Sequence, residues 1–142
     1  MSANQDNPCA FLDSNILIYA ADETDLAKFD KACDIVDAAV RGNGFMISAQ
    51  VLNEFASVMF KKFKKPEEEV DELLSVLEAI TSVPVAPGLT RRAVELKKRY
   101  QLQFFDSLLL ATAEANGCEE FWSEDLNDGQ MYGSVKAVNP FK

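Results

Sequence analysis

The chain has 142 residues, of which 48% are hydrophobic and 26% are charged, a balance that suits a globular domain with a hydrophobic core. Histidine is absent, which excludes Ser-His-Asp catalysis, Cys-His catalysis and HExxH zinc sites, so any catalysis must use carboxylates, alone or with a hard metal ion. The net charge of −9 argues against a general nucleic-acid binder. It leaves open a cluster of acids whose local field a bound divalent cation would invert.

The first eight residues, MSANQDNP, are polar with a single charge and do not form a secretory signal. We expect residues 1–8 to be a flexible polar N-terminus. No apolar run approaches the length of a membrane span, and Cys9, Cys33 and Cys118 lack the Cys-x-x-Cys spacing of a zinc site. We therefore expect a single domain over residues 1–142, located in the cytoplasm and not in a membrane.

Short apolar runs alternate with longer amphipathic runs along the chain. In chain order, we expect a strand at 9–13, helices at 15–21 and 26–40, a strand at 45–48, a helix at 49–63, a helix beginning at Pro66, a strand at 83–86, helices at 90–100 and 104–117, and strands at 119–122 and 134–140. Ser48 suits an N-cap, Pro66 suits a first helical turn, and Gly117 suits a helix end.

The alternation of strands and helices indicates the fold class. Right-handed crossovers between such elements predict a mainly parallel sheet with helices on both faces, an α/β protein with three layers, α/β/α. In a sheet of this kind, the functional site lies at the carboxyl ends of the strands. We therefore looked for chemistry-bearing residues just beyond each predicted strand.

Asp13, Ser14 and Asn15 lie between the first strand and the first helix. Each of them is a good N-cap, but a single helix needs only one, so capping leaves two of the three unexplained. We interpret Asp13 as a metal ligand presented at the end of a strand. Ser14 and Asn15 would then hold the turn and orient the ligand.

Two further acids lie on predicted helices. Glu54 falls at the edge of the apolar face of helix 49–63, where a solvated side chain is the ordinary interpretation. Asp106 falls on the apolar stripe of its helix, and no Lys or Arg lies within a turn of it on that helix. Asp106 could be an N-cap, but a buried carboxylate without a partner is costly.

A third group of acids follows the strand at 119–122. The segment SEDLNDGQ, residues 123–130, contains Glu124, Asp125 and Asp128. Asp and Asn favour turns, which explains part of this composition. Turn formation does not explain why three acids gather just beyond the carboxyl end of a strand.

These acids can converge at one edge of the predicted sheet. Carboxylates a few Å apart repel one another and raise each other's pKa values. A Mg²⁺ or Mn²⁺ ion removes that cost, because both ions prefer oxygen ligands. The sequence therefore predicts a divalent-metal site in which Asp13 takes part.

Four segments of the sequence resemble the PIN-domain family, and within it the VapC-type ribonuclease toxins. They are FLDSNILIYA, ISAQVLNEF, FFDSLLLATAEANGC and FWSEDLNDGQ, which come in the family's order and span nearly the whole chain. The family's acidic positions fall on Asp13, Glu54, Asp106 and Asp125, with Asp128 as an auxiliary acid, and its small polar positions on Ser14, Asn15 and Ser123. One departure is Phe105, where the family often has Trp.

The resemblance implies a PIN-like fold and a Mg²⁺- or Mn²⁺-dependent endoribonuclease, a hydrolase in which a metal-activated water attacks an RNA phosphodiester. The expected products carry 5′-phosphate and 3′-hydroxyl ends. The resemblance also implies a type II toxin–antitoxin system. The expected partners are therefore an RNA substrate, a cognate antitoxin that blocks the acidic pocket, and a second copy of the chain in a homodimer.

An acidic protein must still hold RNA. Basic runs occur at 61–65 and 91–99, and solvated helix faces are the ordinary interpretation of each. Lys61 differs because it lies seven residues after Glu54, on the same side of the helix. We expect Lys61 to help steer phosphate toward the acids.

Two other functions compete with this one. A haloacid-dehalogenase-like phosphotransferase should have a second Asp two residues after the strand-end Asp13, where this chain has Asn15. A non-catalytic PIN-like binding module would use the acids only as caps and solvated side chains. The presence of all four principal acids argues against the second alternative.

Overall fold

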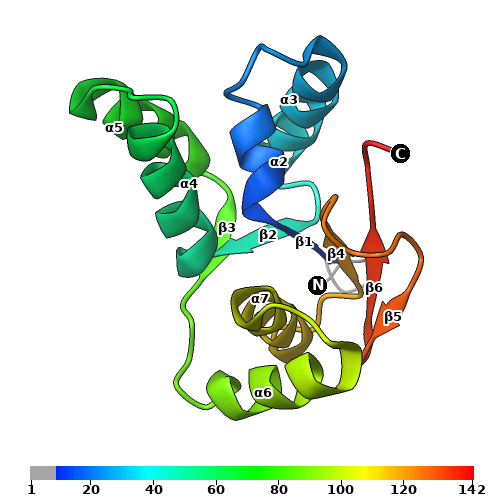
Figure 1. The fold of residues 1–142 in the computed structure, drawn as a ribbon. Coiled ribbons are helices and arrows are strands. Elements are labelled where there is room, and N and C mark those ends of the chain that lie inside the picture. The colour runs from blue at the N-terminus through cyan, green and yellow to red at the C-terminus, as the bar shows by residue number, and fades with distance from the viewer. Residues whose placement is uncertain (1–8) are drawn as a thin grey trace.

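A computed structural model describes residues 9–142 as an α/β sandwich around one six-stranded sheet (Figure 1). In chain order its elements are β1 (Ala10–Leu12), α2 (Ser14–Tyr19), α3 (Leu26–Val40), β2 (Phe45–Ser48), α4 (Ala49–Lys61), α5 (Glu67–Leu77), β3 (Thr81–Val83), α6 (Leu89–Tyr100), α7 (Phe104–Ala115), β4 (Glu120–Trp122), β5 (Met131–Tyr132) and β6 (Val135–Val138). The flexible N-terminus predicted for residues 1–8 lies outside the described residues. Within residues 9–142, no helix combines the length and apolar character that crossing a bilayer requires.

The strand order is β3-β2-β1-β4-β6-β5, and every neighbouring pair is parallel except β5 with β6. The chain first moves outward from β1 to β2 and β3, and then crosses back to β4. Because both directions use right-handed crossovers, the helices of the first part and of the return must lie on opposite faces. Figure 1 shows α2 to α5 on one side of the sheet and α6 with α7 on the other. The predicted three-layer α/β/α architecture is confirmed.

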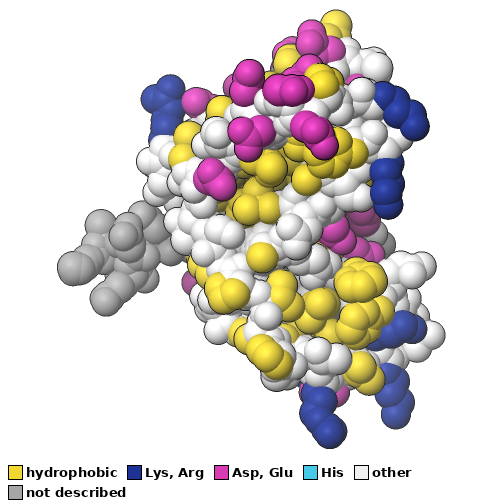
Figure 2. All heavy atoms as spheres, turned by 90° about the vertical axis from the view of Figure 1, so that its left-hand side faces the viewer, with side chains coloured by type: hydrophobic (Ala, Val, Ile, Leu, Met, Phe, Trp, Pro, Cys, Tyr) yellow, Lys and Arg dark blue, Asp and Glu magenta, His cyan; other side chains and the backbone are white. Residues whose placement is uncertain are grey.

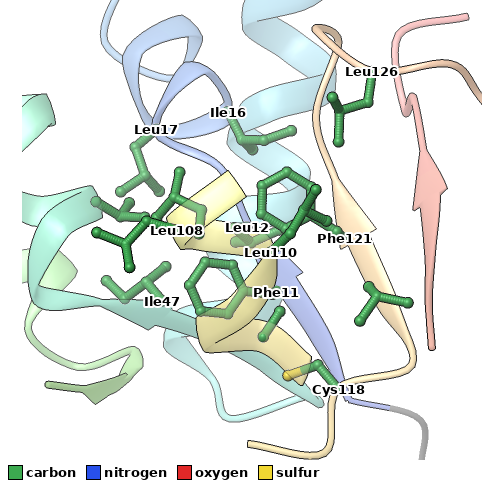
Figure 3. Close-up of a cluster of buried hydrophobic side chains, with 14 of the residues drawn as sticks. Phe11, Leu12, Ile16, Leu17, Ile47, Leu108, Leu110, Cys118, Phe121 and Leu126 are labelled. Atoms are coloured by element: carbon green, nitrogen blue, oxygen red, sulfur yellow. The ribbon is translucent and has the colours of Figure 1, made fainter. Parts of the chain in front are cut away.

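The core lies on both faces of β1, the central strand, whose three residues are all buried. Phe11 stacks on Phe121 of the neighbouring β4, with ring centroids 5.7 Å apart and ring planes 12° apart. Leu108 and Leu110 of α7 pack against the same cluster (Figure 3). Complete burial of a side chain of this size stabilises a fold by roughly 1.5–3 kcal/mol. The strand that leads into Asp13 is therefore among the most firmly held in the molecule.

Local signals in the sequence set most helix boundaries. Ser48 is the N-cap of α4, and its hydroxyl accepts the Val51 N–H at 3.4 Å. Pro66 precedes α5, whose first turn carries Glu67, Glu68 and Glu69 at the positive end of the helix dipole. The predicted helix at 26–40 and the predicted strand at 45–48 are found with those bounds.

Two predictions about the strands need correction. We expected the third strand at 83–86, but β3 runs over Thr81–Val83 and pairs with β2. This edge strand is mostly exposed, so backbone pairing sets its register, and Pro84 has no N–H with which to extend it. The sequence analysis also missed β5, a two-residue strand that pairs with β6 through a turn at Gly133, where φ is +63°.

All six strands belong to one sheet, which supports a single domain. That boundary, residues 1–142, stays a prediction.

Candidate metal centre

The candidate site lies at the carboxyl ends of β1 and β4. These two strands pair in parallel, with Leu12 opposite Trp122, so the next residue of each strand follows at the same edge of the sheet. The Asp13 N–H donates to the Trp122 carbonyl at 3.0 Å. The Ser123 hydroxyl donates to Asp13 Oδ2 at 2.7 Å. The sheet register thus joins the first and last polar segments that the sequence predicted.

Asp13 is almost completely buried, with only 4% of its surface exposed. Its Oδ1 accepts the Ser14 N–H at 2.7 Å, so Asp13 also caps α2. Burial raises the pKa of the Asp13 carboxyl to about 7, although the hydrogen bonds from Ser123 and Ser14 act in the opposite direction, and the charges of Asp106 and Asp125 raise it further. Capping and metal binding are therefore compatible interpretations of this residue.

Asn15 joins the two strand ends. Its amide nitrogen lies 3.1 Å from Asp125 Oδ2, 3.1 Å from Ser123 Oγ and 3.4 Å from Asp13 Oδ2. The Asp125 N–H also donates to Ser123 Oγ, at 3.0 Å. These contacts hold the carboxylates of Asp13 and Asp125 next to each other. The sequence analysis placed Asn15 and Ser123 in this supporting role.

Asp106 and Glu54 approach from the other side, on α7 and α4. Burial raises the pKa of Asp106, and the charges of Asp125 and Glu54 raise it further. Asp106 is therefore close enough to both acids for their charges to act on it. The Gln50 side-chain amide donates at 3.3 Å both to Glu54 Oε2 and to the Phe105 carbonyl, which ties α4 to the start of α7. The N-cap of α7 is Gln103, so Asp106 is not its cap.

Among the described residues, none of the ion pairs includes Asp13, Glu54, Asp106 or Asp125. Over residues 9–142, no three acidic or sulfur-bearing side chains are already grouped tightly enough to enclose an ion. Within residues 9–142, no Lys or Arg therefore forms an ion pair that offsets the charges of these four acids.

The donor set fits a hard divalent cation. It consists of carboxylate oxygens, which Mg²⁺ and Mn²⁺ prefer as ligands. The Asn15 Oδ1 atom is buried and accepts no hydrogen bond from residues 9–142, so one further oxygen lies unpartnered beside the acids. In addition, Asp13 is buried and forms no ion pair within the described part of the chain, an arrangement that a bound cation would relieve.

The remaining predicted residues have different surroundings. Asp128 Oδ1 accepts the Asn139 N–H at 2.8 Å, so its carboxylate is engaged at the far end of the loop. Lys61 is exposed at the C-terminal end of α4, two helical turns from Glu54. The Ser14 hydroxyl lies 3.4 Å from Asp13 Oδ1, in addition to the contact through its N–H.

The sequence analysis missed three residues around the site. Gln50 lies four residues before Glu54, and Tyr19 lies four residues after Asn15, so helical spacing could have indicated both. Lys28 forms an ion pair with Glu124 at 2.8 Å. No local signal pointed to that pair, because 96 residues separate its members.

Comparison with known proteins shows how this arrangement is classified. The fold is shared by a toxin–antitoxin complex from Klebsiella pneumoniae, with 23% identity and a TM-score of 0.65 over 92% of this chain and 97% of that chain. It is shared by VapC20 of Mycobacterium tuberculosis, a sarcin-ricin loop cleaving toxin, with 17% identity and a TM-score of 0.65 over 89% of this chain and 98% of that chain. VapBC2 from Rickettsia felis, bound to a promoter DNA fragment, has 18% identity and a TM-score of 0.69 over 92% of this chain and 98% of that chain. A search of curated proteins finds no match. The PIN domain family matches residues 10–128, a span that contains all four acids. The chain therefore belongs to the PIN domain family.

Proposed function

We propose that this protein is a metal-dependent endoribonuclease that hydrolyses RNA phosphodiesters, and that it is the toxin of a type II toxin–antitoxin system. One observation carries the proposal. Four carboxylates from separate segments, Asp13, Glu54, Asp106 and Asp125, act on one another electrostatically at the carboxyl edge of the sheet, and no ion pair within the described residues offsets them.

The same four acids would hold a Mg²⁺ or Mn²⁺ ion. When bound, such an ion stabilises negative charge on phosphoryl oxygens and lowers the pKa of a water molecule. Asp13 is fixed for this purpose by Ser123 and Ser14, whose hydrogen bonds to it are both 2.7 Å long. The absence of His from the chain is consistent with this chemistry, which needs no imidazole base.

Comparison with other proteins supports RNA as the substrate. Among the similar folds, the protein from M. tuberculosis is described as a toxin that cleaves the sarcin-ricin loop. We extend to this chain only the substrate class, RNA. Separately, we propose that the protein acts in the cytoplasm. Lys61, exposed beyond Glu54 on α4, would steer phosphate toward the acids.

We place the antitoxin on an apolar hollow of about 130 Å³ between α2, α3, α4 and α5, which we call the α2–α5 hollow. It is lined by Leu17, Ala20, Ala21, Val36, Phe55, Leu73, Val76 and Leu77. Val76 is 54% exposed there, so the hollow presents an apolar side chain that a partner could cover. A partner that brings an Arg toward the acids would also suit the net charge of −9.

We place the second copy of a homodimer on a larger hollow of about 570 Å³ beside the acids, the α4–α7 hollow. It is lined by Ala49, Gln50, Asn53, Glu54, Ser57, Val85, Phe105 and Leu108. Phe105 is 60% exposed. Figure 2 shows hydrophobic side chains gathered over the lower half of this face, below a group of acidic side chains. Exposed apolar surface of this kind marks interfaces between proteins.

The proposal is tested by incubating a panel of structured RNAs with the protein in Mg²⁺ or Mn²⁺. We expect internal cleavage that leaves 5′-phosphate and 3′-hydroxyl ends, and loss of cleavage with EDTA. Asp13→Asn is the active-site control, because it keeps the size of the side chain and removes its charge. Equal cleavage by the wild type in EDTA would refute the mechanism.

The alternatives give different results in the same experiment. A haloacid-dehalogenase-like phosphotransferase would release phosphate from a phosphomonoester and leave RNA intact. A non-catalytic PIN-like module would bind RNA without cutting it in either metal. The position that the phosphotransferase needs as a second Asp is Asn15, whose amide donates to Asp125 and Ser123, and this does not favour that activity.

A further inference from the structure

Three consecutive residues, Ser123, Glu124 and Asp125, follow β4, and side chains of other elements hold each of them. Ser123 and Asp125 are bound by Asn15, in the first turn of α2. Glu124 is bound by Tyr19, the last residue of the same helix. Because Asn15 and Tyr19 are four residues apart, they project from one side of α2 and contact successive residues of one loop.

Both oxygens of the Glu124 carboxylate accept a hydrogen bond. The Tyr19 hydroxyl donates to Glu124 Oε2 at 2.5 Å, and Lys28 Nζ donates to Glu124 Oε1 at 2.8 Å. Lys28 Nζ also donates to the Tyr19 hydroxyl at 3.3 Å, which closes a three-membered network. The side chains of Lys28 and Glu124 are only 33% and 23% exposed, so solvent screens the pair less than it screens a free surface pair.

Aromatic packing fixes the network from outside. The Tyr19 ring meets the Phe141 ring edge to face, with centroids 5.1 Å apart and ring planes 71° apart. Lys28 Nζ lies 4.8 Å from the Tyr19 centroid and 5.8 Å from the Phe141 centroid. The C-terminal segment, α2 and α3 therefore converge on the residue directly before Asp125. We call Tyr19, Lys28 and Glu124 the loop clamp.

We infer that the loop clamp is a positioning device for the metal site, in which Tyr19 and Lys28 act through Glu124 to hold Asp125 toward Asp13. This inference rests on the proposed function. It also assigns roles within the acidic loop. The clamp binds Glu124, and the Asn139 N–H binds Asp128 Oδ1 at the far end of the loop. Asp125 is the loop acid that Asn15 holds beside Asp13, so we assign it to the ion. Partners that orient a metal ligand typically change metal affinity by about 10–100-fold when they are removed.

The test uses Tyr19→Phe, which removes one hydroxyl and keeps the ring against Phe141, and Lys28→Met, which removes the charge. We expect Mn²⁺ to bind about 10-fold more weakly to either variant in a calorimetric or thermal-shift titration. In the metal-free protein, the Asp125 N–H, bonded to Ser123 Oγ, should exchange with solvent about 5-fold faster or more. Lys28→Arg keeps the charge, so it should have the Mn²⁺ affinity and the Asp125 N–H exchange rate of the wild type.

A matched control comes from the opposite side of the fold. The Tyr100 hydroxyl accepts the Gly133 N–H at 2.8 Å and the Tyr100 ring packs edge to face on Tyr132, so Tyr100→Phe removes a similar contact far from the acids. Tyr100→Phe should leave Mn²⁺ affinity and Asp125 exchange unchanged. An equal loss of Mn²⁺ affinity in Tyr100→Phe and Tyr19→Phe would overturn the inference, because it would reflect general destabilisation.

The two proposals can fail separately. If the wild type cuts no RNA while Tyr19→Phe still weakens Mn²⁺ binding and speeds Asp125 exchange, the nuclease function is wrong and the loop clamp is supported. If the wild type cuts RNA in a metal-dependent way and neither clamp variant changes Mn²⁺ affinity or exchange, the clamp is wrong and the nuclease function is supported.

Discussion

Asp13 and Ser123 are joined by a 2.7 Å hydrogen bond although 110 residues separate them in the sequence. Parallel pairing of β1 with β4 produces this contact, because Leu12 lies opposite Trp122 and each of them is the last residue of its strand. The bond supplies a buried carboxylate with a donor, and donors of this kind lower a carboxyl pKa. It does not compensate for burial, since the pKa of Asp13 is still raised to about 7.

The first prediction concerns the metal-free protein. A carboxyl whose pKa is about 7 when folded and 3.8 when unfolded binds a proton more tightly in the folded state. Its ionisation therefore leaves the free energy of unfolding unchanged below pH 3.8 and lowers it progressively as the pH rises toward 7. Above that pH, the free energy of unfolding is lower by roughly 4 kcal/mol. Asp13→Asn should raise the free energy of unfolding at pH 8 and change it little at pH 4.

Urea denaturation at both pH values, with EDTA present, measures this difference. Asp37→Asn is the control, because Asp37 is an exposed acid on α3 whose only ion pair among residues 9–142 is with Arg41. Asp37→Asn should change the free energy of unfolding by well under 1 kcal/mol at either pH. Equal stabilisation by Asp13→Asn at pH 4 and pH 8 would show that the charge of Asp13 is not the cause.

The second prediction is that metal binding releases protons. The metal requires ionised carboxylates, and the pKa values of Asp13 and Asp106 are both raised in the metal-free fold. Mn²⁺ affinity should therefore increase as the pH rises from 5 to 7 and level off above that range. Calorimetric titration in two buffers with different ionisation enthalpies measures the protons released. A release of zero at pH 6 would contradict the raised pKa of Asp13.

The sequence predicted those parts of the site that depend on local rules. Asp13 was found because it follows a predicted strand, and because Asp13, Ser14 and Asn15 offer three capping residues where the next helix needs only one. Asn15 and Ser123 were assigned supporting roles, and the structure places both between the acids. Likewise, the three-layer fold follows from the alternation of strands and helices together with the handedness of crossovers.

The parts that the sequence did not predict depend on tertiary packing. Nothing near Lys28 in the sequence indicates a partner 96 residues away, and Glu124 looks equivalent to Asp125 until the Lys28 contact separates them. A related reason explains why the sequence analysis misplaced one edge strand, β3, and missed the other, β5. β3 is largely exposed, and β5 has only two residues, so neither carries the apolar pattern on which strand prediction depends.

The third prediction concerns Gln50, which donates to Glu54 and to the Phe105 carbonyl. Gln50→Leu keeps the approximate volume of the side chain and removes both hydrogen bonds. Glu54 and the start of α7 are then no longer linked through residue 50. We expect Mn²⁺ affinity to fall on the order of 10-fold, with a change of less than about 1 kcal/mol in the free energy of unfolding. Calorimetric titration with Mn²⁺ and urea denaturation measure the two quantities.

Asn53→Leu is the control for Gln50. Asn53 lines the same hollow on the same helix, and within residues 9–142 it hydrogen-bonds to none of the four acids. A similar loss of Mn²⁺ affinity in Asn53→Leu would mean that the affinity depends on polar side chains in the α4–α7 hollow in general, and not on the hydrogen bonds of Gln50.

The fourth prediction concerns the α4–α7 hollow as a dimer surface. Phe105→Lys places a charge at an exposed ring in a hollow that Val85 and Leu108 also line, and burying that charge in an interface would be costly. The variant should sediment as a monomer at protein concentrations where the wild type sediments as a dimer. Phe60→Lys is the matched control, because Phe60 is also an exposed Phe, on α4, but does not line the hollow. A Phe105→Lys variant that dimerises as the wild type does would place the second copy elsewhere, because a lysine in the centre of a dry interface cannot be tolerated without a loss of affinity.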